Sequence, residues 1–207
     1  MARYASAMSR TPSELDTPPV VLDLADSCVR FVKRALRIEL DYTPETLPIL
    51  DHYLREAQGV ERDEIVNLVA PAAGAYFGEV VRRQLGPSRW YWISDDFGEC
   101  RIEFDRCFLS FNPIGSALEA VLGAEAEGYG SALSLLPEDE NLVRESLERT
   151  GDVSEADYYR LAVRFEVIEQ VVALLVEKAI AKDELSRRFG PEVYAALREQ
   201  KSSGMLH

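Results

Sequence analysis

The sequence predicts an α+β fold: a helix-rich single domain with a small antiparallel β-meander, of about three strands, packed against helices. Two adjoining patterns support this prediction. From Glu61 to Gly86 the apolar residues recur every three to four positions, which is the period of a helix with a buried face. From Arg89 to Phe111 the period changes to two, which is typical of strands. The flanking segments have helical periods, so we expect helices to cover this central unit.

Length and composition are those of one folded domain. The chain has 207 residues, of which 47% are hydrophobic and 29% are charged, so a sizeable core is expected. Residues 1–19 are rich in Ser, Thr and Pro and predict a disordered tail. We expect the single α+β domain to run from 20 to 200, followed by a second tail over 201–207.

Two helices are expected before the central unit. Val20–Ile38 has an amphipathic period, with Cys28 on its buried side. The next helix has Thr43 as its N-cap and Pro44 at its first position, and it ends at Gly59. The central helix then begins near Glu61. Pro71 is expected to kink it, because proline lacks the amide that bonds one turn earlier.

Gly74 and Gly78 lie one turn apart in the central helix. Each glycine costs up to about 1 kcal/mol relative to alanine in a helix, so the pair indicates that another part of the chain packs closely there. Tight packing is the favoured interpretation. The alternative is a binding groove for a ligand or partner, formed by Gly74, Gly78, Glu79, Trp90 and Trp92.

Three strands are expected, with a two-residue turn at Asp105–Arg106 between the second and third. The strands are Arg89–Ile93, Cys100–Phe104 and Cys107–Phe111. The opposed pairs would be Phe104 with Cys107, Ile102 with Leu109, Cys100 with Phe111, Trp92 with Ile102 and Trp90 with Phe104. This register puts the apolar side chains on one face and Arg101, Glu103 and Ser110 on the other, and it brings no two cysteines together for a disulfide.

Helices are also expected after the sheet. Asn112 followed by Pro113 predicts a helix start, and Gly123 ends that helix. Ser154 predicts the start of the longest helix. The remaining helices are expected from Pro137 to just before Gly151, from Ser154 to Lys182, over Asp183–Phe189 and over Pro191–Gln200.

The charge of the chain argues against several partner classes. The formal net charge is −13 and the sequence pI is about 4.7, which disfavours binding to nucleic acid or to anionic membranes. No run approaches 18 apolar residues, and the first 19 residues lack the apolar run of a secretory signal. Three cysteines suit a reducing compartment, so a cytoplasmic location is expected.

Motifs for catalysis or cofactor binding are not evident. His52 is the only histidine besides His207, which excludes a histidine metal cluster and disfavours a Ser-His-Asp triad. A structural role for His52 is favoured, with a general base as the alternative. The segment from Gly74 to Gly78 lacks the lysine and hydroxyl residue of a phosphate-binding loop. Glu79 precedes Arg82 and Arg83 by three and four positions, which predicts an ordinary ion pair along the helix worth about a few tenths of a kcal/mol. We therefore assign no catalytic, cofactor-binding or metal-binding residue and expect no cofactor.

Negative charge is concentrated between Gly123 and Asp157, a window that holds −8 of the net −13. The helix that starts at Pro137 opens with Glu138, Asp139 and Glu140. One interpretation is a solvated helical face. The other is an acidic docking surface for a basic partner, formed by these three residues.

Three blocks resemble an uncharacterised family of bacterial proteins, a domain of unknown function with a GAYFGEV-type helix block. The blocks are Leu40–Leu47 with Leu50 and Asp51, then Gly74–Glu79 with Arg82, Arg83 and Trp90, then Asp157–Leu161 with Arg164–Glu166. The resemblance covers about residues 20–180, and Pro71 departs from the family's pattern. It implies a recurring domain without an assigned activity.

Together these patterns favour a non-catalytic protein-interaction or regulatory domain, not an enzyme, with another protein as its partner. One alternative is an immunity- or antitoxin-like protein that neutralises a basic partner. A second is a small-molecule binding domain that uses the Gly74, Gly78, Trp90 and Trp92 surfaces. A third is an enzyme that uses Asp41, Asp51 and Glu79, which would require these carboxylates to converge in a cleft. No oligomeric state is predicted.

Overall fold

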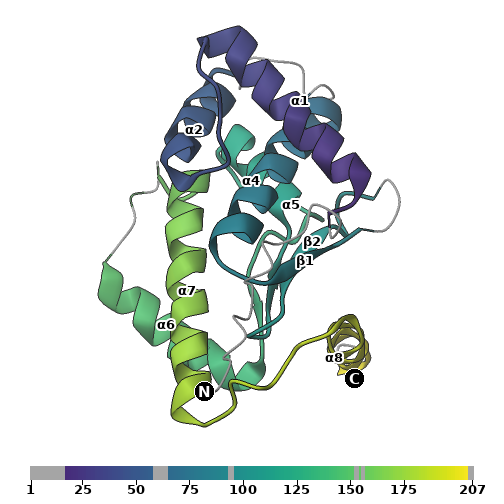
Figure 1. The fold of residues 1–207 in the computed structure, drawn as a ribbon, viewed down its shortest axis with the longest axis vertical. Helices are drawn as coiled ribbons and strands as arrows, with labels where there is room; N and C mark the ends of the chain where they lie inside the picture. Colours follow the sequence, from purple (N-terminus) through teal and green to yellow (C-terminus); the bar gives the residue numbers. More distant parts are fainter. Residues whose placement is uncertain (1–16, 58–64, 93–95, 152–153, 155–156, 205–207) are drawn as a thin grey trace, which may run out of the picture.

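The helix-rich α+β prediction is confirmed (Figure 1). The structure, a computed structural model, describes residues 17–57, 65–92, 96–151, 154 and 157–204. This part of the chain contains seven α-helices and a four-stranded antiparallel sheet in the order β1-β2-β3-β4. The helices are α1 (Pro19–Leu36), α2 (Leu47–Glu56), α4 (Ala70–Gln84), α5 (Pro113–Leu122), α6 (Pro137–Thr150), α7 (Leu161–Ala181) and α8 (Pro191–Gly204). The strands are β1 (Ser88–Tyr91), β2 (Arg101–Phe104), β3 (Leu109–Phe111) and β4 (Ser134–Leu135).

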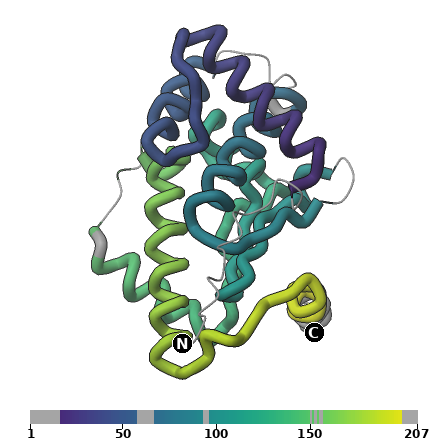
Figure 2. The backbone as a smooth tube through the Cα atoms, viewed as in Figure 1, coloured from purple at the N-terminus to yellow at the C-terminus, as the bar shows by residue number. Residues whose placement is uncertain are grey.

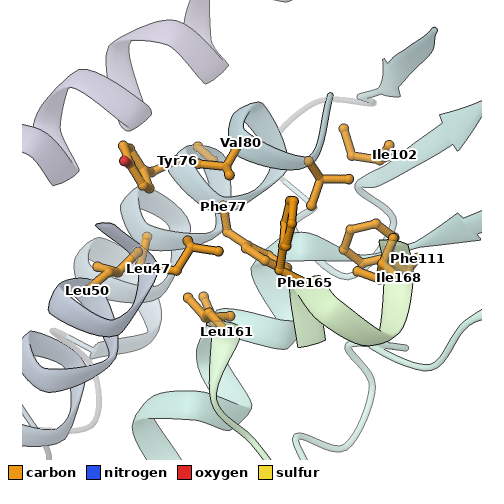
Figure 3. Packing of buried hydrophobic residues seen from close by; sticks show 14 of the residues in the cluster. Leu47, Leu50, Tyr76, Phe77, Val80, Ile102, Phe111, Leu161, Phe165 and Ile168 are labelled. Atoms are coloured by element: carbon orange, nitrogen blue, oxygen red, sulfur yellow. The ribbon is translucent and has the colours of Figure 1, made fainter. Parts of the chain in front are cut away.

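Helix α4 is the centre of the molecule. It packs against α1 on one side and α5 on the other, while α7 runs along the flank with α6 beside it (Figures 1 and 2). Figure 3 shows the core between these elements, with Tyr76, Phe77 and Val80 of α4 facing side chains from the sheet, α2 and α7. The other labelled core residues are Leu47, Leu50, Ile102, Phe111, Leu161, Phe165 and Ile168.

Every residue of α4 from Ala70 to Arg82 is buried, because neighbours surround the helix on all sides. Pro71 lies in its first turn, where a missing amide matters least. A π-helical turn over Ile65–Val69 precedes it. Pro71 therefore lies one residue past the junction between the π-helical turn and the α-helix. The predicted start of this helix at Glu61 lies outside the described residues.

The predicted register is wrong by two residues in both hairpins. Trp90 opposes Ile102, where Phe104 was expected, and Ile102 opposes Phe111, where Leu109 was expected. The loop between β2 and β3 runs from Asp105 to Phe108, and the hydroxyl of Tyr194 on α8 lies within hydrogen-bond distance of backbone groups of Phe104, Cys107 and Leu109 around it. A shift of two keeps each side chain on its face, so the apolar face is as predicted. The predicted pairing through Ile93 and Ser94 falls outside the described residues.

Both faces of the sheet are covered, whereas the sequence predicted one buried face. Strand β2 is buried along its whole length. Its second face lies under the C-terminal segment, whose Phe189 and Tyr194 form a small separate cluster with Phe108 and Leu136. Figure 2 shows this segment leaving α7 and returning as α8. Residues 183–189 are irregular, not helical as predicted, and the short strand β4 was not predicted.

The start of α7 was also predicted incorrectly. The helix begins at Leu161, not at Ser154, and Asp157–Tyr159 forms a turn. Glu155 and Ala156 lie outside the described residues. Asp51 of α2 accepts hydrogen bonds from the amides of Leu161 (2.7 Å) and Ala162 (3.1 Å). A side chain from another helix therefore caps α7, which no local pattern reveals.

The boundaries of α5 and α6 agree with local sequence signals, whereas α2 begins at Leu47 after a 3-10 turn over Pro44–Thr46, not at Pro44. Asn112 Oδ1 accepts hydrogen bonds from the amides of Ile114 and Gly115 and caps α5, as predicted. Gly123 ends α5 with a φ of 63°, and α6 begins at Pro137. Helix α8 extends four residues into the predicted tail over 201–207, whose last three residues lie outside the described part, as do residues 1–16 of the first tail. None of the described helices combines the length and the apolar character that crossing a membrane requires.

Candidate functional site

The most concentrated polar site in the interior is built around Glu79 of α4. Its Oε1 accepts hydrogen bonds from Thr17 Oγ1 (3.0 Å), Arg82 Nε (2.8 Å) and Trp90 Nε1 (2.9 Å). Its Oε2 accepts from Arg82 Nη2 (3.0 Å) and Arg83 Nε (3.2 Å). One carboxylate thus joins the segment before α1, the last turn of α4 and the strand β1.

Burial and these hydrogen bonds act on Glu79 in opposite directions. The residue is fully buried, and burial alone raises the pKa of its carboxyl group. The hydrogen bonds from Arg82 and Trp90 and the charge of Arg82 outweigh burial, so the pKa lies below its ordinary value. Arg82 is also buried, while Arg83 is partly exposed and lies 3.8 Å from the centroid of the Tyr42 ring. Glu79 is therefore an ionised anchor inside the protein.

This finding corrects the prediction of an ordinary intrahelical ion pair. The sequence spacing to Arg82 and Arg83 is right, but the carboxylate and Arg82 are both inside the molecule. The signal was present, because from Ala70 to Val81 Glu79 is the only charged residue. A helix that is apolar all round is buried, and a single charge within it must find partners inside.

The two glycines of α4 lie at contacts too close for a side chain, as the packing interpretation expects. A Cβ atom at Gly74 would lie 2.4 Å from Ile114 Cα of α5, and one at Gly78 would lie 2.3 Å from Trp90 Cζ2. Of the five residues of the proposed groove, Gly74, Gly78, Glu79 and Trp90 are buried together. Trp92 is half-buried and packs edge-on against Trp90 and Phe97. The space expected for a ligand is filled by the indole of Trp90 and the first turn of α5.

The carboxylates considered for catalysis have separate partners. Asp41 is exposed and accepts hydrogen bonds from Thr43 and Thr46, which lower the pKa of its carboxyl group. Asp51 is buried at the start of α7, and burial raises the pKa of its carboxyl group despite the two amide hydrogen bonds. His52 lies on the exposed side of α2, and its Nε2 is 3.5 Å from Glu56 Oε1. No hydrogen bond or ion pair within the described ranges joins Asp41, Asp51 and Glu79 to one another.

The cysteines are buried and free. Burial raises the pKa of the Cys100 and Cys107 thiols to about 12, and it raises the pKa of Cys28 as well. These thiols stay protonated at neutral pH and behave as small apolar side chains. Across the residues that the structure describes, no group of three or more His, Cys, Asp and Glu side chains has an arrangement that could hold a metal ion.

The acidic start of α6 is divided between surface and interior. Glu138 and Glu140 are exposed, whereas Asp139 is buried and forms an ion pair with Lys178 of α7. Asp139 therefore does not offer a free carboxylate to a partner. A cavity of about 110 Å³ lies beside this ion pair, between α6, α7 and the C-terminal segment. Its walls carry side chains of both charges, among them Glu138, Lys178 and Lys182.

Another buried carboxylate, that of Glu103, lies on the covered face of the sheet. Glu103 is buried and accepts hydrogen bonds from Arg89 Nε (3.1 Å) and Arg101 Nε (2.8 Å). Arg89 also donates to the Phe189 carbonyl through both terminal nitrogens, at 3.0 Å each. The sequence placed Arg101 and Glu103 on the face opposite the core but did not predict a cover. The sequence feature that indicates such a cover is the pair of aromatic residues Phe189 and Tyr194 near the end of the chain.

No protein-family model matches this chain, and comparisons with curated proteins and with solved structures gave no match either. The resemblance to a bacterial family thus stays a prediction.

Proposed function

We propose that this chain is a non-catalytic protein-interaction or regulatory domain. The proposal is carried by one observation: the polar side chains that the sequence singles out for chemistry hold elements of the fold together. Glu79 joins Thr17, two residues before α1, to α4 and β1, and Asp51 caps α7. A buried carboxylate that accepts hydrogen bonds from several protein donors is well suited to holding elements of the fold together. Its oxygen atoms are already bonded within the protein and are not available to a substrate.

The charge distribution supports a basic protein as the partner. Helices α6 and α7 lie side by side (Figure 1). Both helices carry exposed glutamates. We use the name acidic face for the exposed glutamates of these two helices taken together: Glu138, Glu140, Glu145, Glu148, Glu166, Glu169 and Glu177. The exposed arginines of α6, Arg144 and Arg149, offset only part of it. A surface of one sign attracts partners of the other sign and speeds their encounter.

Reversing charge on the acidic face tests this proposal. Proteins captured from a lysate of the native host are compared between the wild type and the Glu138→Lys/Glu140→Lys variant. The matched control is Asp23→Lys/Glu45→Lys, which changes net charge equally at exposed positions on α1 and just before α2. Figure 1 shows α1 and α6 at different ends of the molecule.

We expect a stoichiometric basic partner with the wild type and with the control, and its loss or severalfold weakening with the α6 variant. Equal weakening in both double variants would show a non-specific response to net charge and would contradict the proposal. So would a wild-type protein that captures no stoichiometric partner.

A further inference from the structure

Two buried guanidinium donors without a partner lie at one aromatic ring. Arg101 Nη2 and Arg198 Nε are buried and have no hydrogen-bond partner in the described part of the chain. The guanidinium of Arg101 lies 3.4 Å from the centroid of the Tyr91 ring, and that of Arg198 lies 4.7 Å from it. Tyr91 and Arg101 belong to the sheet, whereas Arg198 belongs to α8. The ring therefore marks the place where the C-terminal helix meets the sheet.

The two guanidinium groups also share Glu99 as a neighbour. Arg101 Nη1 donates to the Glu99 carbonyl (3.3 Å), and Arg198 Nη1 lies 4.0 Å from Glu99 Oε2. Glu103 is already engaged with Arg89 and with Arg101 Nε. Three arginines thus face two glutamates at this junction, a local positive excess in a chain of net charge −13.

A small oxyanion is the chemical group that would complete this junction. Unmet buried donors are destabilising, and guanidinium groups form their strongest hydrogen bonds with carboxylates and phosphates. The junction is open to solvent at one side, because the Arg198 and Glu99 side chains are 38% and 62% exposed. We propose that Tyr91, Arg101 and Arg198 form a binding site for a small oxyanion, a phosphate or carboxylate group, between the sheet and α8.

Such a ligand would favour the docked position of α8, because it would bind Arg101 of β2 and Arg198 of α8 at the same time. Helix α8 is held mainly by the small cluster around Phe189 and Tyr194, and residues 181–188 before it are all exposed. A ligand that binds only the docked state multiplies the docking equilibrium constant by one plus the ratio of its concentration to its Kd. At ten times the Kd, docking is favoured about elevenfold more.

The test uses the full chain titrated with sodium phosphate, with sodium acetate and with sodium chloride at matched ionic strength. We expect a saturable shift of the Arg198 Nε–Hε signal in ¹⁵N NMR spectra with phosphate, acetate or both, and none with chloride. Hydrogen exchange over residues 191–198 should slow about tenfold near saturation. A response to phosphate alone identifies a phosphoryl ligand, and a response to acetate alone identifies a carboxylate ligand.

Two variants and a control make the test specific, with hydrogen exchange as their common readout. Arg198→Gln should abolish the ligand-induced slowing, while Arg149→Gln, which removes the same charge at an exposed position of α6, should keep it. Because Arg198→Gln could also loosen α8, Glu99→Gln provides an independent check: removing the competing carboxylate should tighten oxyanion binding severalfold. The proposal fails if chloride produces the same response, if no oxyanion saturates, or if Glu99→Gln weakens binding.

Discussion

Gly78 lies beneath the indole of Trp90, and Gly74 lies against the backbone of α5. We expect Gly74→Ala to lower the free energy of unfolding by about 1–3 kcal/mol, because the new methyl group would lie 2.4 Å from Ile114 Cα and force the helices apart. Alanine favours a helix by about 1 kcal/mol, so a loss of stability would show that packing outweighs helix propensity here. Urea denaturation followed by circular dichroism measures the difference.

Gly190→Ala is the matched control for this substitution. Its Cβ would meet the end of the flexible Glu192 side chain, which can turn away, so the free energy of unfolding should change little. If Gly74→Ala were as stable as the wild type, the close approach of α4 and α5 would not be the reason for the glycine.

Glu79 is expected to make stability depend on pH. Its pKa in the folded protein lies below its ordinary value of 4.5, so the unfolded chain binds the proton more tightly. The stability that this carboxylate contributes is fully present above its ordinary pKa and is lost as the pH falls through the folded pKa. Glu79→Gln should lower the free energy of unfolding at neutral pH by about 3–5 kcal/mol, because it leaves the charge of Arg82 buried without its partner.

Urea denaturation across a pH series checks both statements. The wild type should lose stability steadily as the pH falls below about 5, while the Glu79→Gln variant should show a smaller loss over the same interval. Glu45→Gln, at an exposed position, serves as the control and should resemble the wild type. A variant whose stability fell with pH as steeply as that of the wild type would assign the acid sensitivity to other carboxylates.

Single residues also show how far the sequence predicts this interior. The glycine pair predicted close packing, and the alternating strands put Trp90 on the apolar face, both correctly. The three-residue spacing between Glu79 and Arg82 predicted the ion pair but not its burial. The same spacing forms ion pairs on solvent-exposed and on buried faces of a helix. The contact with Thr17 spans 62 positions, and no local pattern encodes it.

At the scale of elements, a helix start that is capped by a residue nearby in the sequence was predictable, whereas one capped by a residue distant in the sequence was not. Helix α5 begins where its own Asn112 caps it, whereas α7 begins where Asp51 of another helix caps it, 110 positions earlier. The sheet follows the same rule. Alternation fixed which side chains face the core, but the register depends on a loop that wraps around Tyr194, 85 positions beyond Leu109.

Tyr194 is predicted to hold the β2–β3 hairpin and α8 together. Its hydroxyl accepts a hydrogen bond from the Leu109 amide (3.1 Å) and lies 2.9 Å from the carbonyl oxygens of both Phe104 and Leu109, to one of which it donates. Tyr194→Phe should lower the free energy of unfolding by about 1–3 kcal/mol, because it leaves buried backbone groups without a partner. Hydrogen exchange at the Leu109 amide should become faster.

Tyr158→Phe is the control for this substitution, since Tyr158 is 59% exposed. It should leave both the stability and the Leu109 exchange rate unchanged. If Tyr194→Phe left the Leu109 amide as protected as in the wild type, the Tyr194 hydroxyl would not stabilise the β2–β3 hairpin, and this prediction would be wrong.

At the scale of the whole molecule, several buried charges are paired while exposed charges are mainly of one sign. Glu79 and Glu103 each have arginine partners inside the protein. The acidic face of α6 and α7 carries exposed glutamates with few cations nearby, and the chain as a whole has a net charge of −13. Repulsion between like surface charges opposes folding, whereas the buried pairs are shielded from dissolved ions.

This separation predicts how stability responds to salt. Raising sodium chloride from about 0.01 M to about 0.15 M shortens the screening length from about 30 Å to about 8 Å, which weakens repulsion across the acidic face but hardly affects buried pairs. The Tm measured by calorimetry should therefore rise over this interval. The Glu138→Lys/Glu140→Lys variant should show a smaller rise, because it starts with less repulsion, and the Asp23→Lys/Glu45→Lys variant should fall between it and the wild type. A Tm that fell with added salt would mean that attractive surface pairs outweigh the repulsion between the exposed glutamates.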